Sequence, residues 1–412
     1  MKIQTLEDLI QDQQTEKVLF TFDEFLQTHS EFGSCNIDKG FSLSEILGSA
    51  SNKLLPRIEL AKPEDALELS QIFREIYKGT YPYKEFEDEM KFKKMIEDPK
   101  FYWFKFLINK NKLIGCIGFH VDSNKKCGTL HGLVIKEIYQ GLAEIPNLII
   151  GIIYSIIKKF RNIIFHLSCE VRASHNKSQF FGKVAGLLPV GFLPNKDLFY
   201  NRVESEFVII LYDRIVFKEY RIQEKPKIVY PILNCYAFAS KIYNIGLPIL
   251  EPYTTNIKYN RVEIKKIRRN LVKHIIVDEN GNSYCKFTVK TNGSFFKFFH
   301  NKIIQNIERT EFKIENKEEL HIFLQEAKKY IFKNGVRYFE FFFPVNDPIY
   351  QIILLEADFK PFGYIPSYNY NRMKDIFEDV IIFVYFRTET NNLQLISETR
   401  EFLEYIKPDY VK

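Results

Sequence analysis

Paired cysteines are missing from this sequence of 412 residues. None of its cysteines belongs to a C-x-x-C pair, and no H-x-x-x-H histidine pair accompanies them, so we predict no zinc or other metal site. Scattered single cysteines are typical of reduced thiols, and we therefore expect a cytoplasmic location. The six cysteines are Cys35, Cys116, Cys127, Cys169, Cys235 and Cys285.

A strong charge of one sign and a long apolar run are also missing. The formal net charge is only +6, with acidic and basic residues interspersed, so nucleic acid is an unlikely partner. The most apolar run, Leu148–Ile157, is about half of the ~20 residues that a membrane span needs, and it predicts a buried helix. The polar first residues, MKIQTLEDLIQDQQTEK, predict no cleaved signal peptide.

Apolar and aromatic residues are abundant, at 46% and 16% of the chain. The length exceeds the ~250–300 residues at which a single core stops growing, so we predict more than one domain. The expected division is an N-terminal extension at 1–55, a first domain at 56–215, a proline-containing linker with one helix at 216–255, a second domain at 256–390, and a C-terminal helix at 391–412.

Each predicted domain alternates strand and helix patterns. RIEL at 57–60 predicts a strand, Pro63 opens a helix, and two apolar stretches joined by NKNK at 109–112 predict a hairpin. The order β-α-β-β-β-α-β-α-β indicates an α/β (α+β) fold with a mixed sheet. In the second region ENGN at 279–282 predicts another hairpin.

An internal repeat relates the ends of the two regions at a shift of 172 residues without a gap. Convergent α/β patterning would explain the apolar matches but not the shared proline and glycine. The matched pairs are Gln179 with Gln351, Ala185 with Ala357, Pro189 with Pro361, Gly191 with Gly363, Pro194 with Pro366, Glu206 with Glu378, and Val208-Ile209-Ile210 with Val380-Ile381-Ile382.

Several motifs mark the first region: RIELAKPEDA at 57–66, LIGCIGFH at 113–120, LVI at 133–135, NKSQFFGKVAGLL at 176–188 and PVGFLP at 189–194. Together they resemble the GNAT superfamily of N-acetyltransferases. GTYPY at 79–83 and SHNKSQ at 174–179 resemble a subgroup with a degenerate second half. The resemblance implies two tandem GNAT-like mixed-sheet domains with an N-terminal extension.

In this family a Gln/Arg-x-x-Gly-x-Gly/Ala loop holds the pyrophosphate of acetyl-CoA on backbone N–H groups at a helix N-terminus. The corresponding loop here runs Gln140, Gly141, Leu142 and Ala143, with alanine at the glycine place and Ile145 at the last place. Pro146 removes one further donor. The loop is thus either a weakened acetyl-CoA cradle or a tight turn that no longer binds it.

Two further elements carry over from the resemblance as cofactor-binding candidates. The strand Leu133, Val134 and Ile135 would pair with the pantetheine arm, although any half-buried strand shows this pattern. Asn176 would lie beside the pantetheine, although asparagine is also an ordinary helix N-cap.

Catalysis in this family needs a base for the amine and an acid for the leaving thiolate. Glu170, after the fifth strand, is the candidate base, and His175 could relay the proton. Both could equally be ordinary surface groups. Lys183 occupies the place where many family members have a tyrosine acid, so the acid is unassigned, with Tyr139 and Tyr200 as possible substitutes.

The function predicted from the resemblance is transfer of an acyl group, expected to be acetyl, from CoA to a small amine or a peptide N-terminus. The alternative is a non-catalytic GNAT-fold binding or assembly protein that has lost acetyl-CoA, so the enzyme question stays open. The second region has Glu308–Glu311 in place of the loop and is not expected to bind CoA. The basic stretch 258–274 is expected to be a strand edge or loop face. The sequence says nothing of oligomeric state.

Overall fold

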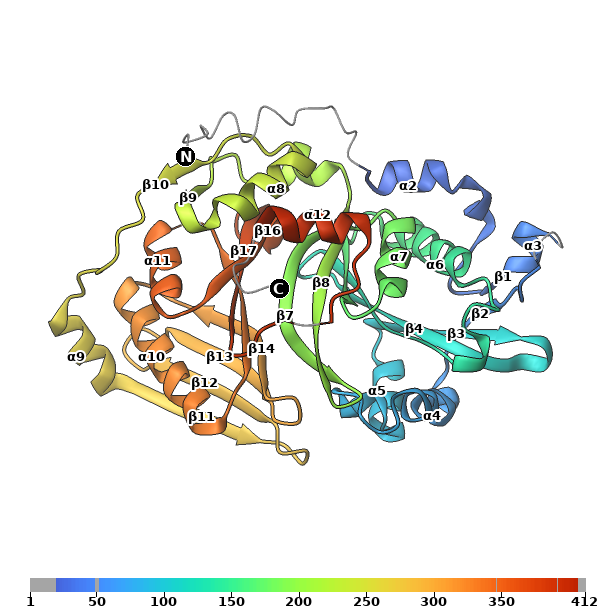
Figure 1. The fold of residues 1–412 in the computed structure, drawn as a ribbon, viewed down its shortest axis with the longest axis horizontal. Helices are drawn as coiled ribbons and strands as arrows, with labels where there is room; N and C mark the ends of the chain where they lie inside the picture. Colours follow the sequence, from blue (N-terminus) through green and yellow to red (C-terminus); the bar gives the residue numbers. More distant parts are fainter. Residues whose placement is uncertain (1–19, 49–51, 346, 391, 407–412) are drawn as a thin grey trace.

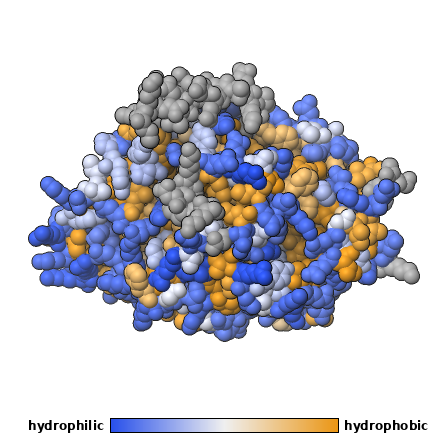
Figure 2. Space-filling view, in the orientation of Figure 1, coloured by the Kyte–Doolittle hydropathy of each residue, from blue (hydrophilic) through white to orange (hydrophobic). Residues whose placement is uncertain are grey.

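The computed structural model describes residues 20–48, 52–345, 347–390 and 392–406. Fifteen strands form one continuous mixed sheet, which crosses the whole molecule (Figure 1). Among the described residues no helix is long and apolar enough to span a membrane. On the face shown in Figure 2, hydrophilic residues are spread among hydrophobic ones. The first nineteen residues of the predicted extension lie outside the described residues.

The first half of the sheet follows a short N-terminal part. Its elements are α2 (Phe22–Thr28), β1 (Phe41–Ser42), α3 (Leu43–Leu47), β2 (Arg57–Leu60), α4 (Ala66–Tyr77), α5 (Glu89–Glu97), β3 (Phe101–Ile108), β4 (Lys112–Asp122), β5 (Cys127–Ile135), α6 (Ile145–Phe160), β6 (His166–Arg172), α7 (Asn176–Val184), β7 (Leu188–Phe199) and β8 (Arg202–Tyr212).

A middle segment and the second half complete the chain. Their elements are β9 (Lys227–Val229), α8 (Leu233–Tyr243), β10 (Ile249–Glu251), α9 (Arg261–Asn270), β11 (Leu271–Val277), β12 (Ser283–Val289), β13 (Phe295–Asn301), β14 (Asn306–Lys313), α10 (Lys317–Asn334), β15 (Tyr338–Pro344), α11 (Pro348–Glu356), β16 (Lys360–Asn371), β17 (Ile376–Phe386) and α12 (Ser397–Ile406).

Apart from β1, which pairs with β2 at the outer edge of the first half, the strand order of the second half repeats that of the first. From β2 inwards the first half runs β2-β3-β4-β5-β6-β8-β7, and from its outer edge the second runs β11-β12-β13-β14-β15-β17-β16. The halves join where β7 pairs with β16, through Gly191 and Gly363. These two residues are a matched pair of the sequence repeat.

The sequence patterns predict neither of the two strands at this junction. Pro189 and Pro194 in β7, like Pro361 and Pro366 in β16, resemble turn signals. The structure accommodates them with two register shifts against each neighbouring hairpin strand. Pro194 and Pro366 lie inside these shifts, where a residue left out of the ladder needs no N–H group, and Pro189 and Pro361 stand where the other shifts begin.

Other predicted elements need correction. Helix α5 and strand β13 were not predicted, and the stretch 258–274 is not a strand edge or loop throughout, because α9 occupies its middle. Asn260 caps α9 by accepting hydrogen bonds from the N–H groups of Val262 and Glu263. Ile267 of α9 is buried, which fixes the apolar face of a helix that is otherwise highly charged.

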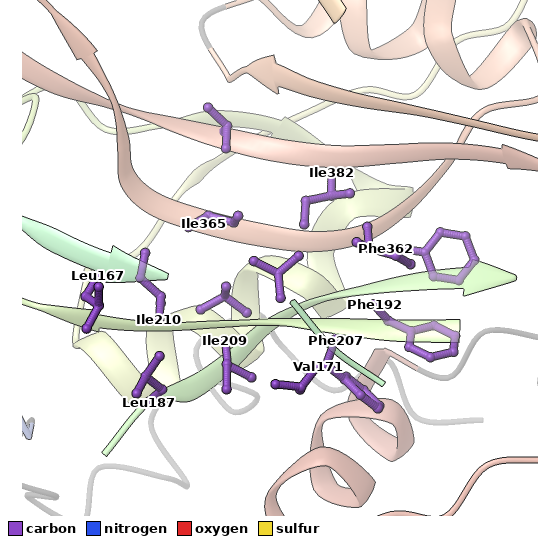
Figure 3. Close-up of a cluster of buried hydrophobic side chains, with 14 of the residues drawn as sticks. Leu167, Val171, Leu187, Phe192, Phe207, Ile209, Ile210, Phe362, Ile365 and Ile382 are labelled. Atoms are coloured by element: carbon purple, nitrogen blue, oxygen red, sulfur yellow. The ribbon is translucent and has the colours of Figure 1, made fainter. Parts of the chain in front are cut away.

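The largest apolar core lies at the junction of the halves. Phe192, Phe207 and Ile209 from the first half meet Phe362 and Ile382 from the second, and Figure 3 shows them packed between the central strands. Helices α8 and α12 cover this part of the sheet, contacting β16 and β7 (Figure 1).

Helices cover both faces of the first half but not of the second. Figure 1 shows α4 and α5 on one side of β3 and β4, with α6 on the other. In the second half the connection between β11 and β12, at the place of α4 and α5, is the short turn 278–282. The face of the sheet next to the junction therefore stays open on the α5 side.

Candidate functional site

The parallel strands β5 and β6 separate before they end. Their register runs from Cys127 with His166 only as far as Leu130 with Cys169. Beyond that point β5 continues to Ile135 and β6 to Arg172 without pairing with each other, although each stays paired with its other neighbour. Two strands that diverge in the middle of a sheet leave backbone groups and a gap between them, into which a ligand chain can fit.

An apolar cavity of about 190 Å³ lies at this gap. Of the predicted pantetheine strand, Leu133 lines the cavity, whereas Val134 is buried and pairs with Cys116 of β4. Ile135 pairs with Gly115 of the same strand. The other apolar lining residues include Ile117, Ile149, Ile153, Val171, Ala185 and Leu187.

The predicted pyrophosphate loop already uses many of its N–H groups. Those of Leu142 and Ala143 both donate to the Tyr139 carbonyl, at 3.1 and 3.2 Å. The N–H group of Glu144 donates to the carbonyl of Leu54 at 2.9 Å. A pyrophosphate at this loop would have to compete with these carbonyls for donors.

Leu54, before the first strand of the domain, is the residue that closes the loop. It forms an isolated parallel bridge with Ala143, and its own N–H group donates to the Leu142 carbonyl at 2.9 Å. Lys53 adds an ion pair with Glu144 at 3.3 Å. The side chain of Ala143 is buried in the core, so the extra methyl group lies away from solvent.

The exposed part of the loop keeps some groups that could bind an anion. Gly141 has a φ of +81°, and its N–H group has no acceptor among the described residues. The side chain of Gln140 donates to the Ile135 carbonyl at 3.2 Å and accepts from Lys177 Nζ at 3.1 Å. Leu142 is exposed. Lys177, which the sequence motifs do not single out, places a cation beside the loop.

Glu170 lies at the separated end of β6 and lines the apolar cavity. Its Oε1 atom accepts a hydrogen bond from Lys196 Nζ at 2.7 Å. Lys196, on β7, is 3% exposed and also pairs with Glu340 of β15 at 3.2 Å. Tyr338 donates a hydrogen bond to the same Glu340 oxygen, Oε2, at 2.7 Å. This buried cation therefore links the predicted base to the second half.

Carboxyl groups next to Glu170 have raised pKa values. Burial, with the nearby carboxylates of Asp197 and Glu170, raises the pKa of Glu206 well above its usual value. Burial raises the pKa of Asp197 to about 8 and that of Glu340 to about 7, although Lys196 opposes both shifts. Glu206 shares a hydrogen bond with Glu170, so the two can share a proton.

The structure separates the other predicted residues. His175 is the N-cap of α7, lines the apolar cavity, and is kept neutral because burial lowers its pKa. Asn176 is the first residue of α7 and is exposed, so it is not the N-cap. Lys183, at the place of the family's acid, pairs with Glu398 of α12 at 2.7 Å.

A larger cavity, of about 620 Å³, lies between the two halves on the open face of the sheet. It is lined by residues of β5 to β8, of the segment before α5, and of β14 to β16. Its charged lining residues are Glu85, Glu170, Lys196, Asp197, Glu206, Glu308, Arg309 and Glu340. Glu170 and Glu206 line both cavities, so the two spaces meet at this carboxyl pair.

The matching gap in the second half is filled. Strands β14 and β15 pair only at Asn306 with Tyr338 and Ile307 with Phe339. Beyond these pairs Phe312 stacks on Phe343, with ring centroids 4.9 Å apart. Glu308–Glu311, which the sequence comparison places opposite the pyrophosphate loop, is instead part of β14. The equivalent loop is 314–316, where Asn316 caps α10.

Sequence reasoning did not select Lys196, Asp197, Glu340 or His131 for this site. His131 lines both cavities, and burial lowers its pKa to about 4. Glu206 was noticed only as a repeat match. The available signal was charged residues inside apolar strands, because such groups are rarely buried without a partner or a role.

Comparisons with known proteins give one family match and several similar solved structures. The family model described as the acetyltransferase (GNAT) family matches residues 66–143. No curated protein matches the sequence. Similar solved structures include the spermidine/spermine N-acetyltransferase SpeG from Vibrio cholerae, at 16% identity and a TM-score of 0.32, covering 38% of this chain and 95% of that chain.

Another similar structure is the ribosomal-protein-S5-alanine acetyltransferase from Vibrio fischeri, at 15% identity and a TM-score of 0.33, covering 39% of this chain and 93% of that chain. The family match spans α4, α5, β3 to β5 and the loop up to Ala143. Residues 66–143 of the chain are thus similar to a GNAT acetyltransferase domain.

Proposed function

We propose that this protein is an acyl-CoA-dependent N-acyltransferase that transfers an acyl group, expected to be acetyl, to an amine. The observation that carries the proposal is the meeting of the two cavities at Glu170 and Glu206. One cavity is apolar and lies where two parallel strands separate, and the other is wide and acidic. A thioester in the first and an amine in the second would meet at this carboxyl pair.

The residues present fit acyl-CoA in part. The apolar lining around Leu133 and Val171 suits a pantetheine arm. The amide groups of that arm could hydrogen-bond to the backbone of β5 beyond Leu130, where β5 no longer pairs with β6. The pyrophosphate would be held by the Gly141 N–H group, Gln140 and Lys177. Since Leu54 engages one further amide, we expect a modest affinity unless that contact opens.

Acyl-CoA supplies the activated acyl group: amine attack forms the C–N bond, breaks the C–S bond, and releases the CoA thiolate. In the proposed mechanism the protein moves two protons. Glu170 accepts the proton that the ammonium must lose before its nitrogen can attack. Burial raises the pKa of Glu206 well above its usual value, which suits this carboxyl group to return a proton to the thiolate. His175, the predicted proton relay, lines the apolar cavity, which we call the acyl slot.

We also propose that the second half is a degenerate copy of the first that lines the acceptor cavity, in keeping with the domain division given above. The identical strand order and the sequence repeat support this. Glu308 and Glu340 place two of its carboxyl groups in the cavity. The acceptor would be a small amine or a peptide N-terminus, and the expected location is the cytoplasm.

The internal hydrogen bonds of the loop are the observation that favours the non-catalytic alternative. If Leu54 held Glu144 permanently, acyl-CoA would lose part of its pyrophosphate site. The GNAT family match and the open slot favour the enzyme over this alternative.

The test is isothermal titration of acetyl-CoA into the full chain and into Leu133→Trp, which fills the slot. We expect micromolar binding to the native chain and at least about a tenfold loss in the variant. Leu67→Trp, at an exposed position of α4, is the matched control and should bind normally. Absence of binding at millimolar acetyl-CoA, with all three chains folded, would refute the proposed function.

A further inference from the structure

The acidic cavity has two ends with different neighbours. At one end Glu170 and Glu206 also line the acyl slot. At the other end Glu85 and Arg309 also line a neighbouring hollow of about 400 Å³, which contains Asp278 and Glu279. A molecule in the cavity can therefore have one end at the reacting pair and extend away from it.

Glu308 of the second half is a buried residue of this cavity that lacks a full set of hydrogen-bond partners. The residue is 4% exposed and lines the cavity. Its Oε2 atom accepts a hydrogen bond from Tyr83 at 3.1 Å, but no donor in the described part of the chain reaches its Oε1 atom. The nearest cation is Arg309 Nε, at 3.7 Å, beyond hydrogen-bond distance. A buried carboxylate oxygen without a donor is costly, so it suits a ligand that supplies one.

The charges of the cavity select a cation. Six carboxyl groups face two basic side chains, Lys196 and Arg309, and Lys196 is already held by Glu170 and Glu340. No cluster among the described residues has the grouping of three ligands that a metal ion would need. An ammonium group supplies charge and up to three N–H donors, which is what Glu308 lacks.

We propose that the acceptor carries two ammonium groups on a flexible chain, and that Glu308 binds the one that does not react. The inference rests on the proposed function for the reacting end, where the first amine loses its proton near Glu170. The second half is then a specificity element, since Glu308 distinguishes a diamine from a monoamine of the same length. Tyr83, from the first half, positions Glu308 through its hydroxyl group.

Binding of such a ligand should release protons. Burial keeps the pKa of Asp197 at about 8 and of Glu340 at about 7, so both groups hold protons part of the time at neutral pH. A bound dication stabilises their ionised forms, and the protons leave to the buffer.

The test is isothermal titration of 1,4-diaminobutane and of butylamine into the full chain without CoA. We expect the diamine to bind at least about tenfold more tightly than the monoamine. Glu308→Gln, which keeps the acceptor for Tyr83, should bring the diamine down to the affinity of butylamine. The matched control Glu311→Gln lies on the same strand, in a side chain that is 59% exposed, and should change nothing.

Repeating the native titration in two buffers of different ionisation enthalpy measures proton release and does not depend on a variant that folds. Equal affinity for the two amines, no binding of either, or no proton release on binding the diamine would overturn the inference. A separate titration with acetyl-CoA distinguishes the two proposals. If acetyl-CoA binds but the diamine is not preferred, the acyltransferase proposal stands and the diamine acceptor is refuted. If the diamine is preferred but acetyl-CoA does not bind, the dication site stands and the acyltransferase proposal is refuted.

Discussion

Gly191 of β7 and Gly363 of β16 pair directly where the two halves of the sheet meet, and they are equivalent positions of the 172-residue repeat. A Cβ atom on Gly363 would lie 2.4 Å from the carbonyl oxygen of Val190 and 2.7 Å from Gly191 Cα. Both contacts are with backbone atoms, which cannot rotate away. Glycine at this point is therefore a condition for joining the halves into one sheet.

The first prediction concerns this junction. Gly363→Ala should destabilise the protein by about 1–3 kcal/mol, because the added methyl group forces the two central strands apart. Urea unfolding followed by circular dichroism measures the change. Gly33→Ala is the control, since a Cβ atom there meets only Tyr154 Oη at 3.7 Å. Equal midpoints for the two variants would show that the close approach of β7 and β16 is not needed.

The second prediction concerns pH. In the folded protein burial raises the pKa of Asp197 to about 8, whereas an unfolded aspartate titrates near ~3.9. Between these values the folded chain binds the extra proton, so its stability falls as pH rises, by at most about 1.4 kcal/mol per pH unit for this group.

Asp197→Asn removes this contribution while keeping an acceptor for Tyr83. Urea unfolding at about pH 5 and pH 8 should show a smaller loss of stability in the variant than in the native chain. Some loss should remain, because the pKa of Glu206 and that of Glu340 are raised in the same direction. A loss as large as that of the native chain would contradict the raised pKa of Asp197.

The third prediction concerns the loop contact. Leu54→Pro removes the N–H group that donates to Leu142 and loosens the carbonyl that engages Glu144. If the Leu54 carbonyl occupies an N–H group that pyrophosphate would otherwise bind, releasing that group should raise the affinity for acetyl-CoA by about three- to tenfold. Asn52→Pro, at an exposed position two residues before Leu54, is the control and should leave the affinity unchanged. Weaker binding in Leu54→Pro would mean that Leu54 supports the cradle rather than closing it.

The fourth prediction concerns the acid. Glu206→Gln should lower acyl transfer about 100-fold or more while leaving acetyl-CoA affinity within about twofold, because the proton for the thiolate is lost. Glu378→Gln changes the equivalent buried residue of the second half, which accepts a hydrogen bond from Asn371, and should retain activity. If both variants transfer acyl groups at the native rate, Glu206 is not the acid.

The sequence predicted most outer strands and helices because their apolar residues follow simple periods. FYWFKFLI and KLIGCIGF became the hairpin β3–β4, and the apolar run 148–157 became the buried helix α6. The central strands β7 and β16 could not be predicted this way, because their prolines resemble turns until the bulges are known. Strand β13 was not predicted because Asn292 and Gly293, just before its aromatic residues, resemble a turn signal.

The site was predictable only where it lies close together in the chain. Glu170 and the loop Gln140–Ala143 could be found by motif, but the partners of Glu170 come from β7 and β15. Lys196 and Glu340 are far apart in sequence, and only the pairing order of the sheet brings them together. The closing of the loop by Leu54 has no motif, because it uses backbone groups that every residue carries.

The most direct test of the account is release of the CoA thiol from acetyl-CoA by the native full chain, with and without 1,4-diaminobutane, together with mass spectrometry of the amine. We predict amine-dependent thiol release with an equal amount of acetylated amine, and about a 100-fold lower rate for Glu170→Gln. Acetyl-CoA that binds but releases no thiol with the diamine, butylamine or a peptide with a free N-terminus would contradict the account.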